Sequence, residues 1–71
     1  MADDIRVRFG RRLRYLREQR GWTQVELAEK LGLDRGYLAD IERGNRSVPL
    51  VNLELIALGF DTTLSRLFSR L

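Results

Sequence analysis

Residues 23–44 read TQVELAEKLGLDRGYLADIERG, and this stretch decides the fold. Its apolar residues recur at the three- and four-residue spacing of a helix, which predicts one helix over residues 24–31 and a second over residues 35–43. Only residues 32–34 separate the two predicted helices. The pair of helices and its short turn therefore span residues 24–43.

The residues at the ends and at the crossing of these helices fit a tight two-helix turn. Thr23 followed by Glu26 is a capping box for the first helix, and Asp34 is a favourable N-cap for the second. Ala28 is small enough to lie where the helices cross, and Gly32 accepts the left-handed backbone that the turn needs. The apolar residues that would share the core are Leu27, Leu31, Leu33, Leu38 and Ile41. Together these features predict a helix-turn-helix motif.

The segment before the motif predicts a long helix over residues 4–20, with Asp3 or Asp4 as its N-cap. Its apolar stripe consists of Ile5, Phe9, Leu13 and Leu16. Seven arginines and three acids lie in residues 1–20, which gives this segment a charge of +4. These arginines occupy the remaining faces of the helix, and we expect most of them to form a solvated surface that raises the long-range field of the protein.

Two further helices are predicted after the motif. Pro49 suits the first position of a helix that reaches residue 58, and Thr62 or Thr63 caps a last helix that reaches residue 70. Glycines follow the apolar stretches, as helix C-terminal glycines do. These glycines are Gly21, Gly32, Gly44 and Gly59. No window alternates apolar and polar residues over the length of a strand, so the prediction is an all-α fold of five helices.

Length and composition exclude several classes of protein. A chain of this size buries only about 60% of the surface that it exposes when unfolded, so it cannot hold two separate cores. Residues 1–71 are therefore expected to form one small domain. The sequence has no cysteine and no histidine, which removes disulfides, the commonest general base and the commonest metal ligand. The three serines have no base partner in the sequence pattern. We therefore predict no enzyme, no metal site and no cofactor.

The predicted compartment and partner follow from apolar patterning and from charge. No apolar run reaches the ~20 residues that cross a bilayer, and the N-terminus lacks the apolar core of a secretory signal, which predicts a cytoplasmic protein without a membrane partner. Thirteen basic residues against ten acidic ones give a net charge of +3, and twelve of the thirteen are arginine. Arginine binds phosphates and guanine edges through paired hydrogen bonds. The composition therefore indicates a polyanion such as double-stranded DNA as the partner.

Residues 23–44 resemble the phage repressor and Cro helix-turn-helix family, of the xenobiotic-response-element type. The resemblance continues through Arg46, Pro49, Asn52-Leu53-Glu54 and Leu64-Ser65-Arg66-Leu67-Phe68. Within that family, the short chain and the turn Leu33-Asp34-Arg35-x-Tyr37 look most like the controller proteins of restriction–modification systems. The resemblance implies a five-helix lambda-repressor-like DNA-binding domain. It also implies a homodimer that binds a palindromic operator and regulates its own gene.

The resemblance places the helix at residues 35–43 in the major groove of DNA. The residues that it presents as base contacts are Arg35, Gly36, Ala39, Asp40 and Arg43. Arg35 is expected to bond guanine O6 and N7 together; alternatively, it binds phosphate or pairs with an acid. Asp40 either accepts a hydrogen bond from cytosine or pairs with Arg43 three residues further on, and the ion pair is the favoured alternative.

The resemblance also implies contacts to the DNA backbone and one structural ion pair. The residues at backbone-contacting positions are Thr23, Gln24, Tyr37, Asn45, Arg46 and Ser47. For Tyr37 the alternative is packing against the core, and Arg46 could instead enter the minor groove. Arg17 and Glu42 match positions that pair between the first and third helices, which predicts a partly buried ion pair.

The last two predicted helices carry more apolar residues than one buried face needs. The residues that fit the core stripe are Leu50, Leu53, Ile56 and Ala57. The remaining apolar residues predict a twofold dimer interface. They are Val51, Leu55, Leu58, Leu64, Leu67, Phe68 and Leu71. The alternative is that the domain buries these side chains itself.

The sequence thus favours a homodimeric, sequence-specific DNA-binding regulator of transcription, with RNA polymerase as a further partner if it activates. Two alternatives stay open. One is an antitoxin or phage-type repressor whose C-terminal helices hold a protein partner. The other is a helical interaction module that does not bind DNA.

Overall fold

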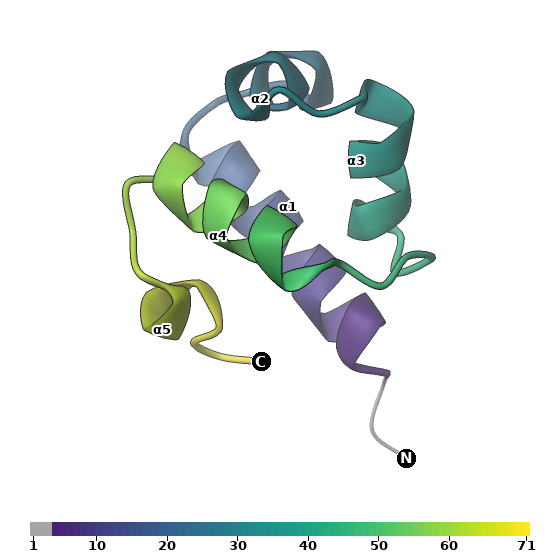
Figure 1. Ribbon diagram of the computed structural model, residues 1–71, viewed down its shortest axis with the longest axis vertical. Helices are drawn as coiled ribbons and strands as arrows, with labels where there is room; N and C mark the ends of the chain where they lie inside the picture. The colour runs from purple at the N-terminus through teal and green to yellow at the C-terminus, as the bar shows by residue number, and fades with distance from the viewer. Residues whose placement is uncertain (1–3) are drawn as a thin grey trace.

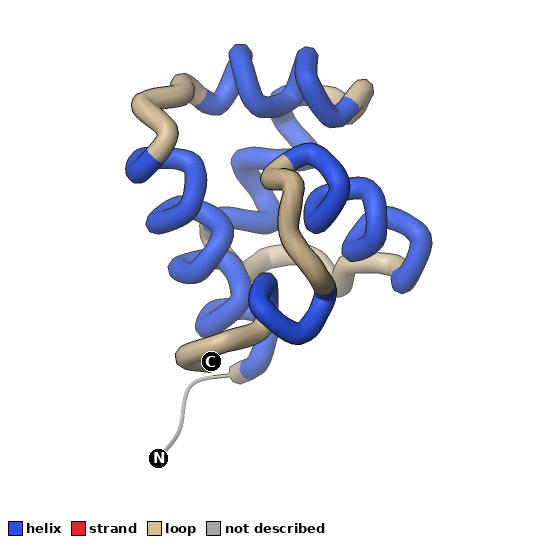
Figure 2. The backbone as a smooth tube through the Cα atoms, turned by 90° about the vertical axis from the view of Figure 1, so that its left-hand side faces the viewer, coloured by secondary structure: helices blue, strands red, loops and turns tan. Residues whose placement is uncertain are grey.

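The structure, a computed structural model, describes residues 4–71 and contains five helices in this part of the chain. They are α1 (Ile5–Gln19), α2 (Gln24–Leu31), α3 (Arg35–Glu42), α4 (Leu50–Gly59) and α5 (Leu64–Leu67). In Figure 1, α1 passes behind α4, α2 and α3 form the upper and right-hand parts of the molecule, and α5 lies at the lower left. Figure 2 shows helices and loops and no strand over the described residues, so the predicted all-α fold of five helices is confirmed.

Local side-chain caps explain where the helices begin. The Asp4 carboxylate accepts a hydrogen bond from the Arg6 backbone N–H at the start of α1. Hydrogen bonds with the Arg6 side chain and backbone lower the pKa of Asp4 to about 2. The alternative cap, Asp3, lies outside the described residues. Thr23 forms the predicted capping box with Glu26, and Asp34 caps α3.

Two of the predicted helix boundaries are wrong. Pro49 is the N-cap of α4 rather than its first helical residue. The last helix ends at Leu67 rather than at residue 70. Arg12 binds the carbonyl oxygens of Arg66 and Leu67, which a continued helix would bond internally.

Gly59 has a different role from the one predicted. It is the last residue of α4, and a Cβ atom added to it would lie 2.2 Å from Leu31 Cδ2. Its lack of a side chain therefore allows close packing against α2. The residue with left-handed backbone after α4 is Asp61, with a φ of 54°.

The core gathers side chains from all five helices. The largest fully buried side chains are Leu13, Leu27, Leu38, Ile41, Ile56, Phe60 and Leu67. Leu67 was predicted to lie in a dimer interface, but its side chain is 0% exposed within the subunit. Leu50 was predicted to lie in the core, but it is 74% exposed. The Leu50 error arises because apolar residues occur on every face of α4, so its pattern does not mark the face that packs inward. Leu67 lies on α5, a helix of four residues whose pattern is too short to mark an inward face.

α1 passes close to the end of α3 at Gly10. A Cβ atom added there would lie 2.5 Å from the carbonyl oxygen of Ile41 and 2.6 Å from that of Glu42. Both contacts would be with backbone atoms, which cannot turn aside as a flexible side chain can. The absence of a side chain at Gly10 therefore allows α1 to lie this close to the end of α3.

None of the helices in the described part of the chain is long and apolar enough to span a membrane.

Candidate nucleic-acid interface

The turn between α2 and α3 has the geometry of a helix-turn-helix. Gly32 has a φ of 69°, in the left-handed region. The Leu33 backbone N–H donates to the carbonyl oxygen of Ala28 at 2.9 Å, which closes the end of α2. Asp34 then caps α3 through the backbone N–H of Tyr37 at 3.1 Å. The connection thus fixes the direction of α3 relative to α2.

The exposed side of α3 presents most of the predicted base-reading residues together. Arg35, Gly36 and Arg43 are exposed, and Asp40 is partly exposed. Ala39 is only 8% exposed. The expectation that Ala39 lies on the exposed face is therefore wrong, because this side of the helix turns toward the core.

Arg35 lies exposed in the first turn of α3, and no hydrogen bond or ion pair joins it to another of the described residues 4–71. None of the ion pairs among residues 4–71 involves Arg35. Pairing with a nearby acid, one of the two alternatives to base reading, is therefore absent from the structure. Its guanidinium keeps all five N–H donors available for an external acceptor.

Asp40 forms the predicted ion pair with Arg43, three residues further along the chain. Its other carboxylate oxygen lies 3.5 Å from Nε of Arg46. The guanidinium of Arg46 also lies over the ring of Tyr37, at 5.3 Å from the ring centroid. These contacts join the end of α3 to the loop that follows it.

Tyr37 has both a packed ring and a bonded hydroxyl. Its ring is partly buried against the core, which is the alternative predicted for this residue. Its hydroxyl accepts a hydrogen bond from Nδ2 of Asn52 on α4 at 3.0 Å. Sequence reasoning missed this role of Asn52, because nothing in the local pattern shows that α4 faces α3 at this point.

Arg17, Gln24 and Glu42 form a cluster where α1, α2 and α3 meet. Nε and Nη2 of Arg17 donate to the two carboxylate oxygens of Glu42 at 2.7 and 3.0 Å. The two side chains are 11% and 4% exposed. Hydrogen bonding to Glu42 raises the pKa of the Arg17 guanidinium above its usual value. Gln24 Nε2 also donates to Glu42 at 3.1 Å, so Gln24 is held in place at the start of α2.

The other predicted backbone-contacting residues lie at the surface. Thr23, Asn45, Arg46 and Ser47 are exposed, the last three in the loop after α3. The Asn45 backbone N–H donates to the carbonyl oxygen of Asp40 at 2.9 Å, which fixes where this loop leaves the helix. No group of histidine, cysteine or acidic residues that could hold a metal occurs within residues 4–71.

Comparison with known proteins gives the family. A helix-turn-helix family model matches residues 13–67. The chain belongs to this helix-turn-helix family. The family and fold predicted from the sequence are therefore confirmed.

Three relatives of this helix-turn-helix protein match it over most of their own length. The control protein C.MunI of a Mycoplasma species is 47% identical over 68 residues, which cover 94% of this chain and 92% of that protein. The control protein C.BamHI of Bacillus amyloliquefaciens is 41% identical over 58 residues, 80% of this chain and 72% of that one. The crystal structure of the restriction–modification controller protein C.AhdI from Aeromonas hydrophila matches with a TM-score of 0.85 at 46% identity, over 89% and 96% of the two chains.

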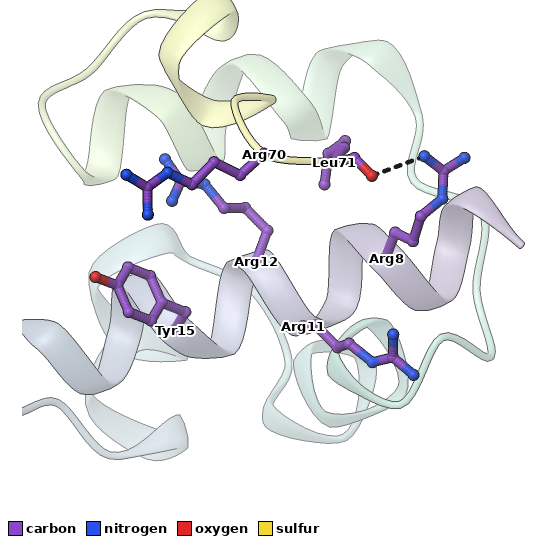
Figure 3. A pocket seen from close by; sticks show the side chains of 6 residues that line it. All are labelled: Arg8, Arg11, Arg12, Tyr15, Arg70 and Leu71. Carbon is purple, nitrogen blue, oxygen red and sulfur yellow. Dashed lines mark hydrogen bonds between the residues drawn. The ribbon is translucent and has the colours of Figure 1, made fainter. Parts of the chain in front are cut away.

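Two arginines of α1 in this helix-turn-helix protein bind the C-terminal residues, a role that was not predicted. Arg8 Nη1 donates to the carbonyl oxygen of Leu71 at 2.8 Å, as the dashed line in Figure 3 shows. Arg12 donates to the carbonyl oxygens of Leu67 and Arg66 at 3.2 and 2.9 Å. These two arginines border a pocket of about 360 Å³ that Tyr15 and Arg70 also line. Arg8 and Arg12 therefore hold residues 66–71 against α1.

The predicted dimer residues of the helix-turn-helix protein divide into three groups. Val51 and Leu58 on α4 are 76% and 69% exposed, and Phe68 is 37% exposed. The residues that are partly buried are Leu55, Leu64 and Leu71. Leu67 belongs to the core and does not reach the surface. Phe68 and Leu71 also line an apolar pocket of about 580 Å³ between α1 and the end of the chain.

Proposed function

We propose that this protein is a homodimeric, sequence-specific DNA-binding regulator of transcription, of the controller type, that regulates its own gene from a palindromic operator. The observation that carries the proposal is the helix-turn-helix with an unpaired Arg35 at the exposed start of α3. Relatives named as control proteins, similar over nearly the whole chain, support it. The proposal includes a cytoplasmic location, where the protein meets its DNA, and a role in binding rather than in catalysis. RNA polymerase is the expected further partner where the protein activates transcription.

In the proposed complex, α3 lies in the major groove. Arg35 reaches base edges, Gly36 allows a close backbone approach, and Asp40 faces the same groove. Arg43, paired with Asp40 at the end of α3, contacts a base edge or a neighbouring phosphate. The residues proposed to contact the sugar–phosphate backbone are Thr23, Gln24, Tyr37, Asn45, Arg46 and Ser47. Thr23 and Gln24 lie at the start of α2, Tyr37 lies on α3 itself, and the other three lie in the loop after α3. The bond from Gln24 to Glu42 supports the assignment, because it holds the start of α2 beside the end of α3.

Selection of bound duplexes from a randomised DNA pool at near-physiological salt tests the proposed function. We expect enrichment of an inverted repeat with half-sites about ten base pairs apart, centre to centre, because a twofold dimer places its two recognition helices one DNA turn apart. If no sequence is enriched and binding disappears in modest salt, the protein has only a sequence-independent attraction to DNA phosphates. The proposal would then be wrong.

Arg35→Ala is expected to abolish the preference for one base pair in each half-site. The loss should be about 1–3 kcal/mol of discrimination, the contribution of a bidentate arginine–guanine contact. The measurement compares binding of the variant to the selected duplex and to duplexes altered at each position. Arg35→Lys is the matched control, because lysine keeps the charge but loses the bidentate geometry. If Arg35→Lys retains full discrimination, Arg35 binds phosphate rather than a base.

Leu58→Asp is expected to convert the dimer into a folded monomer that binds the operator more weakly. Leu58 is 69% exposed in the subunit, so a charge there leaves the core intact but would be buried against a partner. Sedimentation measures the oligomeric state, and thermal unfolding confirms that the subunit stays folded. Val25→Asp, at an exposed apolar position on α2, is the control and should remain dimeric. A Leu58→Asp variant that still sediments as a dimer would refute this interface.

A further inference from the structure

Asp40 lies at an unfavourable place for a carboxylate. It is in the last turn of α3, a turn that contains no basic residue of its own. The partial negative charge at the end of a helix repels an acid there. The other acid in this turn, Glu42, is neutralised by Arg17. Asp40 is instead stabilised by two arginines that follow the helix.

One carboxylate holds both of these arginines. Oδ1 of Asp40 accepts from Nη2 of Arg43, and Oδ2 lies 3.5 Å from Nε of Arg46. Asp40 is 29% exposed, whereas Arg43 and Arg46 are 61% and 54% exposed. The acid therefore lies beneath two cations that reach outward into solvent.

The position of Arg46 is restrained from a second direction. Its guanidinium lies over the ring of Tyr37 at 5.3 Å from the centroid. The hydroxyl of Tyr37 is in turn held by Nδ2 of Asn52 on α4 at 3.0 Å. The guanidinium of Arg46 thus contacts both an acid and an aromatic ring whose hydroxyl is hydrogen-bonded to α4.

The electrostatic consequence concerns DNA of any sequence. Phosphate contacts of arginine supply most of the affinity for non-specific DNA. Without Asp40, Arg43 and Arg46 would present two full positive charges at the end of α3. With Asp40 between them, the three side chains together carry a charge of +1, and each arginine must leave part of its ion pair to bind a phosphate.

We propose that Asp40 determines specificity by acting on Arg43 and Arg46: it positions both guanidinium groups and weakens their binding to phosphates of arbitrary sequence. DNA binding then depends more strongly on the base contacts of α3. This inference rests on the proposed function, because it assumes that the exposed side of α3 faces DNA. Asp40 itself is a positioning residue, and its role requires no contact with a base.

Asp40→Asn tests the inference, with the selected duplex and a scrambled duplex of equal length measured over a range of salt concentrations. Binding to the scrambled duplex should tighten roughly fivefold per subunit, because the arginines no longer give up their attraction to Asp40 when they bind a phosphate. This factor corresponds to one pair of unit charges a few ångströms apart in water. The plot of log K against log salt should steepen by about 0.9 per subunit. The ratio of specific to non-specific affinity should fall.

Three further variants separate this role from simpler ones. Glu29→Gln removes an exposed charge on α2 and should leave the specificity ratio unchanged. Asp40→Glu keeps the charge and should retain most of the wild-type discrimination, and thermal unfolding confirms that both Asp40 variants fold. In an Arg43→Gln, Arg46→Gln background, Asp40→Asn should no longer tighten scrambled-duplex binding. An undiminished effect in that background would mean that Asp40 repels phosphates directly, and the inference would be wrong.

The outcomes also separate this inference from the proposed function. If the wild-type protein prefers no duplex, both are overturned. If the wild type prefers the selected duplex and Asp40→Asn keeps the same ratio and the same salt slope, only the role of Asp40 is overturned.

Discussion

Glu42→Ala is expected to lower the free energy of unfolding by about 3–5 kcal/mol, the usual cost of removing one partner from a buried ion pair. The variant would leave the guanidinium of Arg17 in a site where both partners are almost fully buried. Its remaining protein acceptor there is the carbonyl oxygen of Trp22, at 2.8 Å. Gln24 would lose its bond to Glu42 as well. This loss is a large fraction of the total free energy of unfolding, which is about 5–15 kcal/mol for a domain of this kind.

Thermal and urea unfolding measure this effect. A loss of this size should lower Tm on the order of 20 °C in a small domain. Glu18→Ala is the matched control, because Glu18 pairs with Arg14 on the exposed side of α1. An exposed helix pair of this spacing contributes about 0.3–0.5 kcal/mol. An unchanged Tm for Glu42→Ala would show that the cluster contributes nothing to folding.

Gly10→Ala is expected to destabilise the protein by about 3 kcal/mol, the upper part of the usual range for overpacking a core. The added methyl would lie 2.5 Å from the carbonyl oxygen of Ile41 and 2.6 Å from that of Glu42. Relief requires α1 and α3 to move apart, which would also lengthen the bonds between Arg17 and Glu42. The intrinsic preference of a helix for alanine over glycine, about 1 kcal/mol, acts in the opposite direction and is smaller.

Gly36→Ala makes the same chemical change at an exposed position of α3. Within 4 Å its new methyl would meet only Oδ1 of Asp34, at 3.0 Å, a side-chain atom that caps α3 and would have to shift by a few tenths of an ångström. We expect this variant to lose much less stability than Gly10→Ala, because the clash at Gly10 is with backbone atoms. Equal stabilities of the two alanine variants, measured by urea unfolding, would mean that the close crossing at Gly10 does not constrain the fold.

Features that depend on neighbours in the sequence were predictable. Thr23, Glu26 and Asp34 cap the helices of the motif as expected, because a capping bond joins residues only two or three positions apart. Gly32 takes the left-handed backbone for an equally local reason. The exposed positions of Arg35 and Arg43 follow from helical periodicity once α3 is placed.

Features that depend on contacts between distant segments were not predictable in the same way. Gly10 looks like an ordinary glycine in a helix until the carbonyl groups of α3 are placed beside it. The carbonyl partners of Arg12 lie 54 and 55 residues away. The burial of Leu67 depends on how the short α5 turns against the core, which the apolar pattern of four residues does not determine.

The attachment of α5 to α1 makes the proposed dimer surface depend on the fold of the whole subunit. A helix of four residues has no stability of its own. It gains its shape from Arg12, which binds the carbonyl oxygens of Leu67 and Arg66, and from the core that receives Leu67. The surface proposed for pairing around Phe68 therefore exists only when α5 is packed on the rest of the subunit, so dimer formation would depend on a correctly folded subunit.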